Sequence, residues 1–189
     1  LCIKAFLYIN QLMNNENSYS VILPTLNEVG HINSLIKDIS NNFEKFNIKY
    51  EIIVVDDNSE DGTVEEILKI NNSRVIIHKR TNKKKSLVDS LNEGIIISNN
   101  ENIIWMDADF SHPPNYIDKF INLRNVKNID VIVCSRFLKE STRYYNIQNK
   151  KKAGIDFLSN LLNKICKIFL FSDFTDYTSG YICIKKKNN

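Results

Sequence analysis

The chain has 189 residues, of which 43% are hydrophobic and 25% are charged, as is typical of one folded globular domain. Its formal net charge of +3 is too small to indicate a nucleic acid partner, so we expect no nucleic acid binding. The four cysteines, Cys2, Cys134, Cys166 and Cys183, form no CxxC pair and do not cluster with histidine. They are therefore expected to be reduced in a cytoplasmic protein, with neither a disulfide framework nor a zinc site.

Residues 1–12, LCIKAFLYINQL, form an apolar segment that is too short to span a bilayer. No small-residue cleavage site follows it, as a secretory signal would need. Met13 precedes the polar run NNENS and has the setting of a natural start. We therefore expect residues 1–12 to be a non-native extension and residues 13–189 to form a single domain. Because the chain stops after a strand-like stretch, we also expect that domain to be incomplete at its C-terminal end.

Apolar, β-branched runs alternate with amphipathic segments along the rest of the chain. This alternation predicts an α/β fold of the Rossmann-like kind, a three-layer sandwich around a mainly parallel central sheet. Ligands of such sheets bind outside the carboxyl ends of the strands, so we expect the functional residues in the loops that follow them. The predicted strands are 20–23, 51–55, 74–78, 102–105 and 130–134, and the predicted helices are 29–46, 63–71, 86–98 and 114–124.

The loop after the first predicted strand is PTLNE, Pro24–Glu28. It can be a plain strand-to-helix turn, in which the proline ends the strand and Asn27 caps the helix. Because a second acidic loop follows another strand of the same sheet, we predict instead that PTLNE faces a nucleotide. The fingerprints GxGxxG and GxxxxGK[ST] are both absent from the sequence, which argues against a dinucleotide oxidoreductase or a P-loop NTPase.

The loop after the second predicted strand is DDNSEDGT, residues 56–63. Its end has an ordinary structural explanation, because Asp61-Gly62 is typical of a turn and Thr63 of a helix N-cap. Asp56 and Asp57 differ from these residues, since they leave the strand directly. We predict that they reach donors on a ribose or a base.

The loop after the fourth predicted strand, DADFSHPP, begins with Asp107 and Asp109. Side chains alternate along a strand, so the two carboxylates point the same way and repel each other unless a cation lies between them. Hard divalent cations such as Mg²⁺ take carboxylate oxygens and keep phosphate oxygens as further ligands. The pair therefore predicts a metal that holds a diphosphate, and the alternative is two solvated turn aspartates. His112 is more simply structural than a metal ligand.

Arg136 follows the fifth predicted strand, in the stretch VCSRF. It is either a surface arginine or a group that binds a phosphate with two hydrogen bonds. Further along, apolar residues recur at helical spacing between residues 157 and 169, with lysines between them. This pattern predicts a helix that packs on the core or, alternatively, rests on an anionic lipid surface.

Four stretches in this order, SVILPTLNE, YEIIVVDDNSEDGT, IIWMDADFSHPP and VIVCSRF, resemble the family 2 glycosyltransferases of the GT-A fold. The resemblance runs from about Tyr19 to Lys185 and points to the branch of the dolichol-phosphate (polyprenyl-phosphate) mannosyltransferases. It implies an enzyme that moves a hexose from a nucleotide-sugar donor, such as GDP-mannose or a UDP-sugar, to a polyprenyl or dolichyl phosphate. It also implies Mg²⁺ or Mn²⁺ as cofactor, and a cytoplasmic protein at the cytoplasmic face of a membrane.

The resemblance also assigns roles to single residues. Asp107 and Asp109 would hold the metal, and Asp109 and Arg136 would be catalytic because they stabilise the departing nucleoside diphosphate. A phosphate acceptor is anionic at neutral pH, so its attack on the anomeric carbon needs no strong base, and single displacement predicts inversion. The residues implied in nucleotide-sugar binding are Pro24, Leu26, Glu28, Val55, Asp57, Asp107, Ala108, Asp109 and Arg136.

The sequence departs from the family pattern in several places. Ser86 and Val88 stand where glycines are common, and Ile182 replaces the usual arginine in DYTSGYICIKK, residues 176–186. Lys150–Lys152 stand loosely for the Arg/Ser pair that usually meets the acceptor phosphate. The alternative function is therefore a truncated or inactive transferase fragment with a binding or structural role.

Two other enzyme classes fit less well. A nucleotidyltransferase shares the α/β sheet and the metal carboxylates, but it normally carries a glycine-rich basic loop near its start, which this sequence lacks. A phosphatase with a DxDxT nucleophile carries that motif after its first strand, whereas DADFS follows the fourth predicted strand.

Overall fold

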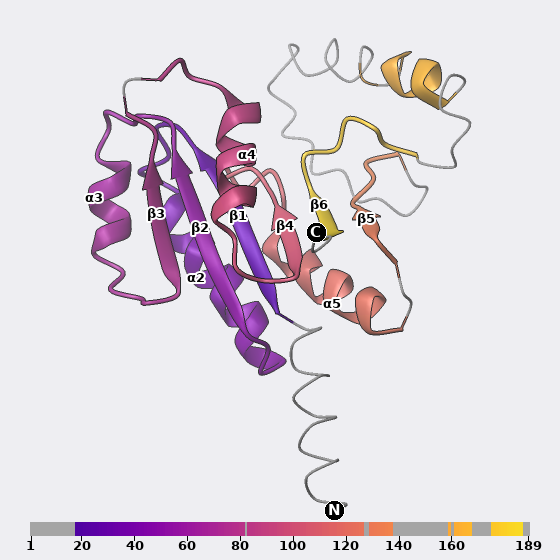
Figure 1. Ribbon diagram of the computed structural model, residues 1–189, viewed down its shortest axis with the longest axis horizontal. Coiled ribbons are helices and arrows are strands. Elements are labelled where there is room, and N and C mark those ends of the chain that lie inside the picture. Colours follow the sequence, from indigo (N-terminus) through magenta and orange to yellow (C-terminus); the bar gives the residue numbers. More distant parts are fainter. Residues whose placement is uncertain are drawn as a thin grey trace, which may run out of the picture. The chain divides into compact units, whose positions relative to one another are not determined.

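The computed structural model describes residues 18–81, 83–126, 129–137, 159, 161–167 and 175–186 (Figure 1). The chain folds into two compact units, one of residues 1–132 with 181–189 and one of residues 133–180. Residues 1–12 lie outside the described part, so their interpretation as an extension stays a prediction. The single domain over residues 13–189 also stays a prediction.

In the part of the chain that the structure describes, six strands form one sheet in the order β3-β2-β1-β4-β6-β5. β1 pairs in parallel with β2 and with β4, β2 pairs in parallel with β3, and β6 is antiparallel to β4. Because β2 and β4 lie on opposite sides of β1, the strand order reverses there, and a ligand crevice is expected at the carboxyl ends of β1 and β4. The strands are β1 (Tyr19–Thr25), β2 (Tyr50–Asp56), β3 (Val75–Lys79), β4 (Asn102–Trp105), β5 (Val131–Val133) and β6 (Ile182–Lys185).

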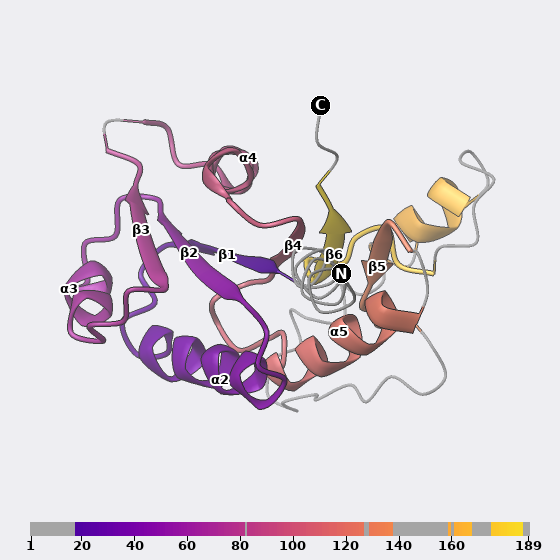
Figure 2. The same ribbon diagram turned by 60° about the horizontal axis from the view of Figure 1, so that its bottom comes forward.

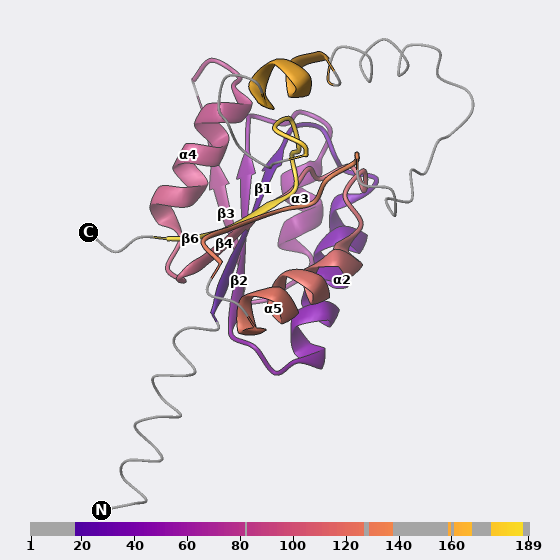
Figure 3. The same cartoon turned by 90° about the vertical axis from the view of Figure 1, so that its right-hand side faces the viewer.

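Helices cover both faces of the sheet in the first unit (Figures 2 and 3). α2, α3 and α5 lie on one face and α4 on the other, which gives three layers. The apolar residues of α2 recur every three or four positions and are buried, so this helix packs one stripe against the sheet. The helices are α2 (Ile32–Lys45), α3 (Thr63–Leu68), α4 (Leu87–Ile97), the 3-10 helix η1 (Pro114–Tyr116) and α5 (Ile117–Val126).

The helix α4 lies unusually close to the sheet at Gly94. A Cβ atom at this position would be 2.5 Å from Cγ2 of Ile22 and 3.2 Å from Cγ2 of Val55. The two strand residues are fully buried, so the sheet surface offers no room for a side chain here. Gly94 therefore sets the distance at which α4, and the loop before it, lie over the strands.

The predicted α/β fold with a mainly parallel sheet is confirmed, and each predicted strand and helix is present with ends shifted by a few residues. One predicted cap is wrong. The N-cap of α3 is Gly62, at φ 94°, one residue before the predicted Thr63. The N-cap of α2 is His31, so the Asn27 cap of the alternative interpretation of PTLNE is absent, and Asn27 has φ 59° in the turn before the helix. Asparagine tolerates this left-handed conformation better than most residues, which explains its place there.

The second unit contains part of the helix predicted over residues 157–169. Residues 159 and 161–167 are helical, and the remaining residues of the prediction lie outside the described part of the chain. Leu161, Leu162 and Ile165 are each more than 40% exposed, so the predicted core face of this helix is only partly covered.

Candidate nucleotide-sugar site

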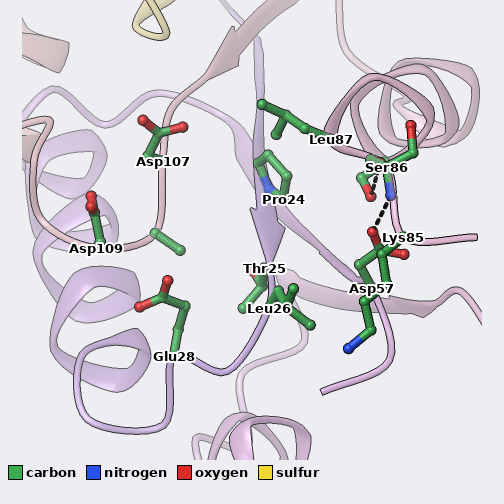
Figure 4. A pocket seen from close by; sticks show the side chains of 12 residues that line it. Pro24, Thr25, Leu26, Glu28, Asp57, Lys85, Ser86, Leu87, Asp107 and Asp109 are labelled. Carbon is green, nitrogen blue, oxygen red and sulfur yellow. Dashed lines mark hydrogen bonds between the residues drawn. The ribbon is translucent and has the colours of Figure 1, made fainter. Parts of the chain in front are cut away.

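A pocket of about 410 Å³ lies at the carboxyl ends of β1, β2 and β4, where the strand order reverses. Residues 24–26 at the end of β1 lie in the middle of it (Figure 4). Glu28, Asp107 and Asp109 lie on one side, and Asp57 lies on the other side beside the start of α4. The structure thus brings together most of the residues that the sequence predicts for nucleotide binding, from three separate loops.

On the first side of the pocket, burial and the negative charges of Asp109 and Asp107 raise the pKa of the Glu28 carboxyl. Burial raises the pKa of Glu28 and the negative charge of Asp109 raises it further, while His31 partly opposes this and Asp61 and Asp107 add smaller raising effects. An added positive charge among these groups would relieve the repulsion. This side of the pocket is therefore electrostatically suited to a cation.

The pKa of Asp109 is shifted in the opposite direction to that of Glu28. Burial raises its pKa, but hydrogen bonds from Ser111, with smaller nearby contributions, outweigh this, and its pKa lies below the usual value. The backbone N–H of Ser111 donates to Oδ1 of Asp109 at 2.9 Å. Asp109 is thus held as a carboxylate, the form that binds a metal.

Asp107 is held by His112 of its own loop, and His112 in turn contacts the residue before β6. Its backbone N–H donates to Nδ1 of His112 at 3.0 Å, and the imidazole stacks on Tyr181 with the ring centroids 5.2 Å apart. Between these residues, Phe110 has φ 59°, a conformation that strains a bulky side chain. Strain of this kind, of about 1–3 kcal/mol, persists where surrounding contacts hold the chain in place.

The loops after β1 and β2 are joined by hydrogen bonds that the sequence did not suggest. The N–H of Asn27 donates to the hydroxyl of Ser59 at 2.9 Å, and the N–H of Glu28 donates to the hydroxyl of Thr63 at 2.8 Å. The N–H of Val29 donates to Asp61 at 3.1 Å. The residues predicted to be a turn and a cap therefore also fix the PTLNE loop along the pocket.

Asp57 belongs to a buried network on the other side of the pocket. Its Oδ1 accepts from Nη1 of Arg80 at 2.5 Å, and its Oδ2 accepts from the backbone N–H of Ser86 at 2.6 Å (Figure 4 shows the second bond). Burial lowers the pKa of Arg80, but the hydrogen bond with Glu93 and the charges of Asp57, Glu93 and Asp89 outweigh it and raise that pKa. Sequence patterns do not single out this arginine, because nothing in its own segment predicts that it is buried.

Three of the predicted residues, Val55, Asp56 and Arg136, are not among the residues that line the pocket. The side chain of Val55 is fully buried in the hydrophobic core and does not line the pocket, so its role toward a nucleotide stays a prediction. Asp56 is buried too, and its Oδ2 accepts from the N–H of Ser59 at 3.0 Å. Arg136 lies in the second unit, where Nε and Nη2 donate to the two oxygens of Asp176 at 2.8 and 3.0 Å. Its contact with a phosphate stays a prediction.

The donor set of the pocket fits a magnesium or manganese ion that is shared with a ligand. Among the described residues, no three His, Cys, Asp or Glu side chains are grouped closely enough to hold a metal ion by themselves. Asp107 and Asp109 supply two carboxylates, and Mg²⁺ is commonly bound by one or two carboxylates together with substrate phosphates.

With this geometry established, comparison with known proteins shows the family. The sequence model described as "Glycosyl transferase family 2" matches residues 20–189. The chain belongs to glycosyl transferase family 2. The family membership expected from the four motifs is thus confirmed.

This family 2 chain has curated relatives in archaea and yeast. It is 31% identical over 175 residues to the dolichol-phosphate mannosyltransferase of Pyrococcus furiosus, covering 89% of this chain and 46% of that protein. It is 35% identical over 106 residues to the dolichol-phosphate mannosyltransferase of Saccharomyces cerevisiae, covering 53% of this chain and 39% of that protein. The chain therefore spans less than half the length of these two relatives.

Solved structures are also similar in fold. Glucosyl-3-phosphoglycerate synthase from Mycobacterium tuberculosis, in complex with Mg²⁺ and UDP, matches with a TM-score of 0.65 at 16% identity, over 89% of this chain and 56% of that chain. The same enzyme with Mn²⁺, UDP and glucosyl-3-phosphoglycerate matches with a TM-score of 0.64 at 16% identity, over 89% and 57%. This likeness is one of fold, and it confirms the expected GT-A architecture.

Proposed function

We propose that the chain is the donor-binding part of a glycosyltransferase that moves a hexose, mannose or a glucose-like sugar, from a nucleoside diphosphate sugar to a polyprenyl or dolichyl phosphate. One observation carries the proposal. In a chain of glycosyl transferase family 2, the carboxylates of Asp107 and Asp109 face one side of a pocket, and the carboxylate of Asp57 lies on its other side. A nucleoside diphosphate needs both, a cation for its phosphates and an acceptor for its base or ribose.

Asp107 and Asp109 are the residues we assign to Mg²⁺ or Mn²⁺. The raised pKa of Glu28 next to them supports a cation on this side of the pocket. The M. tuberculosis enzyme of the same fold was crystallised with either ion and UDP. When bound, such an ion acts as a Lewis acid toward the phosphate oxygens of the departing diphosphate.

The chemistry is a single displacement. A phosphate oxygen of the acceptor attacks the anomeric carbon while the bond from that carbon to the diphosphate oxygen breaks, and its electron pair leaves with the nucleoside diphosphate. The acceptor phosphate is already anionic, so no side chain has to remove a proton. The task of the protein is to hold donor and acceptor in line, which predicts inversion at the sugar. Arg136, which Asp176 holds with two hydrogen bonds, is the residue we assign to a phosphate.

The names of the curated relatives bear on the acceptor and on the location. The two curated relatives are named dolichol-phosphate mannosyltransferases, which favours a polyprenyl or dolichyl phosphate at the cytoplasmic face of a membrane. No helix of the described part of the chain is long and apolar enough to cross a bilayer. The exposed Leu161, Leu162 and Ile165, with Lys164 between them, favour the alternative in which this helix rests on a lipid surface.

Ser86 stands where the family commonly has a glycine, and the local structure accommodates this serine. Ser86 has φ −159°, which is extended backbone open to any residue, and its side chain caps α4 by accepting from the N–H of Asp89. Its own N–H binds Asp57. A glycine is therefore not needed for the loop to form, and the inactive-fragment alternative loses one of its arguments.

Binding and transfer assays with the full-length protein test the proposal. We expect GDP-mannose or a UDP-sugar to raise the melting temperature in the presence of Mn²⁺, and [¹⁴C]-sugar to move onto a polyprenyl phosphate with inverted configuration. Asp109→Asn should abolish the metal-dependent part of both signals, whereas Asp38→Asn on the exposed side of α2 should leave them unchanged. Stabilisation by no nucleotide at all would favour the inactive-fragment alternative, and Mn²⁺-dependent transfer by Asp109→Asn would refute the metal assignment.

A further inference from the structure

Arg80 is a buried arginine directly behind the nucleotide side of the pocket. It follows β3, its side chain is 2% exposed, and its backbone N–H continues the ladder to the carbonyl of Asp56 at 2.8 Å. It does not itself line the pocket that contains Asp57. A buried arginine is rare unless its charge is paired, so its partners show what it does.

The guanidinium controls both the position and the hydrogen-bonding character of Asp57. Nη1 donates to Oδ1 of Asp57 at 2.5 Å, and Oδ2 of Asp57 accepts from the N–H of Ser86 at 2.6 Å. Each oxygen is thereby fixed by one donor and retains a second lone pair. Paired with an arginine, the aspartate is an acceptor only, and Figure 4 shows it at the edge of the pocket.

The same guanidinium holds the neighbouring wall of the pocket. Nη1 also donates to the carbonyl of Ser86 at 3.2 Å and to the hydroxyl of Ser90 at 3.2 Å, and Nη2 donates to the carbonyl of Lys84 at 3.4 Å. Ser86 and Ser90 both line the pocket. Arg80 therefore joins Asp57 to the start of α4, so that the carboxylate and the wall next to it are placed as one unit.

The guanidinium of Arg80 also contacts two carboxylates of α4, Glu93 and Asp89, that do not line the pocket. Nε donates to Oε1 of Glu93 at 3.0 Å, and Nη2 lies 3.4 Å from Oδ2 of Asp89. These contacts fix the plane of the guanidinium independently of any ligand. The geometry of Asp57 is thus set before a nucleotide arrives, as selective recognition requires.

We propose that Arg80 is a positioning residue that selects the donor's base, by presenting Asp57 as a fixed acceptor to the base edge. This inference rests on the proposed function and deepens it. Uracil and guanine carry an N–H on the edge that would face such a carboxylate, whereas cytosine and adenine carry an acceptor nitrogen there. A site built to bind an N–H strongly rejects an analogue that lacks it, because its own acceptor is left unpaired. The selected donors are therefore uridine or guanosine diphosphate sugars.

Binding of UDP, GDP, CDP and ADP to the full-length protein with Mn²⁺ tests the inference, with calorimetry as the measurement. We expect UDP or GDP to bind at least about 10-fold more tightly than CDP and ADP. In Arg80→Met this ratio should fall to about 3-fold or less, while binding of inorganic pyrophosphate with Mn²⁺ should stay unchanged. A role of Arg80 in overall folding alone would weaken all ligands together and leave the ratio intact.

Two further variants keep the test decisive. Arg80→Lys retains the charge but cannot reach Asp57, Ser90 and Glu93 together, so it should reduce the ratio even if Arg80→Met does not fold. Arg74→Met changes an exposed arginine beside Glu44 and should leave the ratio as in the wild type. If folded Arg80→Lys keeps the wild-type ratio between binding of UDP or GDP and binding of CDP and ADP, the inference is overturned while the proposed function stands. A wild-type protein that binds none of the four nucleotides overturns the proposed function and the inference with it.

Discussion

The Nδ1 atom of His112 accepts a hydrogen bond from the backbone N–H of Asp107 at 3.0 Å, so the first aspartate of the DADFSHPP loop is fixed by a histidine five residues later. The imidazole stacks on Tyr181, whose hydroxyl donates to the carbonyl of Pro113 at 3.3 Å. Since Tyr181 directly precedes β6, the loop is braced by the strand that pairs with β4. His112 therefore acts on the expected metal site through the position of Asp107.

Replacement of His112 by phenylalanine tests this role, because His112→Phe keeps a ring to stack on Tyr181 and removes the acceptor. The N–H of Asp107 then loses a partner, which costs about 1–3 kcal/mol. We expect Mn²⁺-dependent nucleotide binding to weaken about 10-fold, as measured by calorimetry. Tyr181→Phe keeps the ring that stacks on His112 and removes the 3.3 Å hydrogen bond to Pro113, so it should change binding less. Equal binding by wild type and His112→Phe would show that the histidine does not position Asp107.

Sequence patterns could predict the architecture and the place of Asp107 and Asp109 at the pocket for a simple physical reason. Runs of β-branched residues report strands that are buried on both faces, and Asp107 and Asp109 lie two residues apart in the loop directly after β4, which ends at Trp105. Both signals are local, so they can be found in one stretch of sequence. The predicted residues of PTLNE and Asp57 follow from the same logic, since parallel strands end at one edge of a sheet.

The residues that hold the site could not be predicted, because their partners are distant in the sequence. Arg80 is buried through Asp57 and Glu93, which lie 23 and 13 residues away. Thr63 has the chemistry of a cap, yet its hydroxyl accepts from Glu28, 35 residues earlier. Only the fold brings these groups together, and a charged or hydroxyl side chain in a loop has the same local pattern whether it is exposed or buried.

The hydroxyl of Thr63 is expected to stabilise the PTLNE loop. It is fully buried, accepts from the N–H of Glu28 at 2.8 Å, and donates to Asp61. Thr63→Val keeps the shape and leaves the N–H of Glu28 without this acceptor, so we expect a loss of about 1–3 kcal/mol in the free energy of unfolding. Urea denaturation measures it. Thr63→Ser retains the hydroxyl and should lose less, and a reversed order would contradict the role of the hydrogen bond.

Gly94 is expected to resist even the smallest side chain. In Gly94→Ala the new methyl group would lie 2.5 Å from Cγ2 of Ile22, so the helix α4 or the strand β1 must shift. Overpacking of this kind costs about 1–3 kcal/mol, which exceeds the gain of about 1 kcal/mol from replacing a helical glycine. Gly30→Ala is the matched control, because nothing lies within 4 Å of its Cβ position. Urea denaturation should show a clear loss of stability in the first variant alone.

Glu93 is expected to make the stability of the protein depend on acid pH. Hydrogen bonds from Lys83, His78 and Arg80 lower the pKa of its carboxyl to about 2, from 4.5. The unfolded chain therefore takes up this proton at a higher pH than the folded protein does. The stabilisation is complete above about pH 4.5 and is lost as the pH falls toward about 2.

The comparison of wild type with Glu93→Gln isolates this contribution, because all other titrating groups are common to both proteins. We expect the wild type to be more stable in urea between pH 5 and 6, and the gap to shrink steadily as the pH falls through 4.5. Glu44→Gln is the control, since Glu44 and its partner Arg74 are both more than half exposed and such pairs contribute little. A gap that stays constant, or widens, at low pH would mean that Glu93 is not held as a carboxylate by Arg80 and its neighbours.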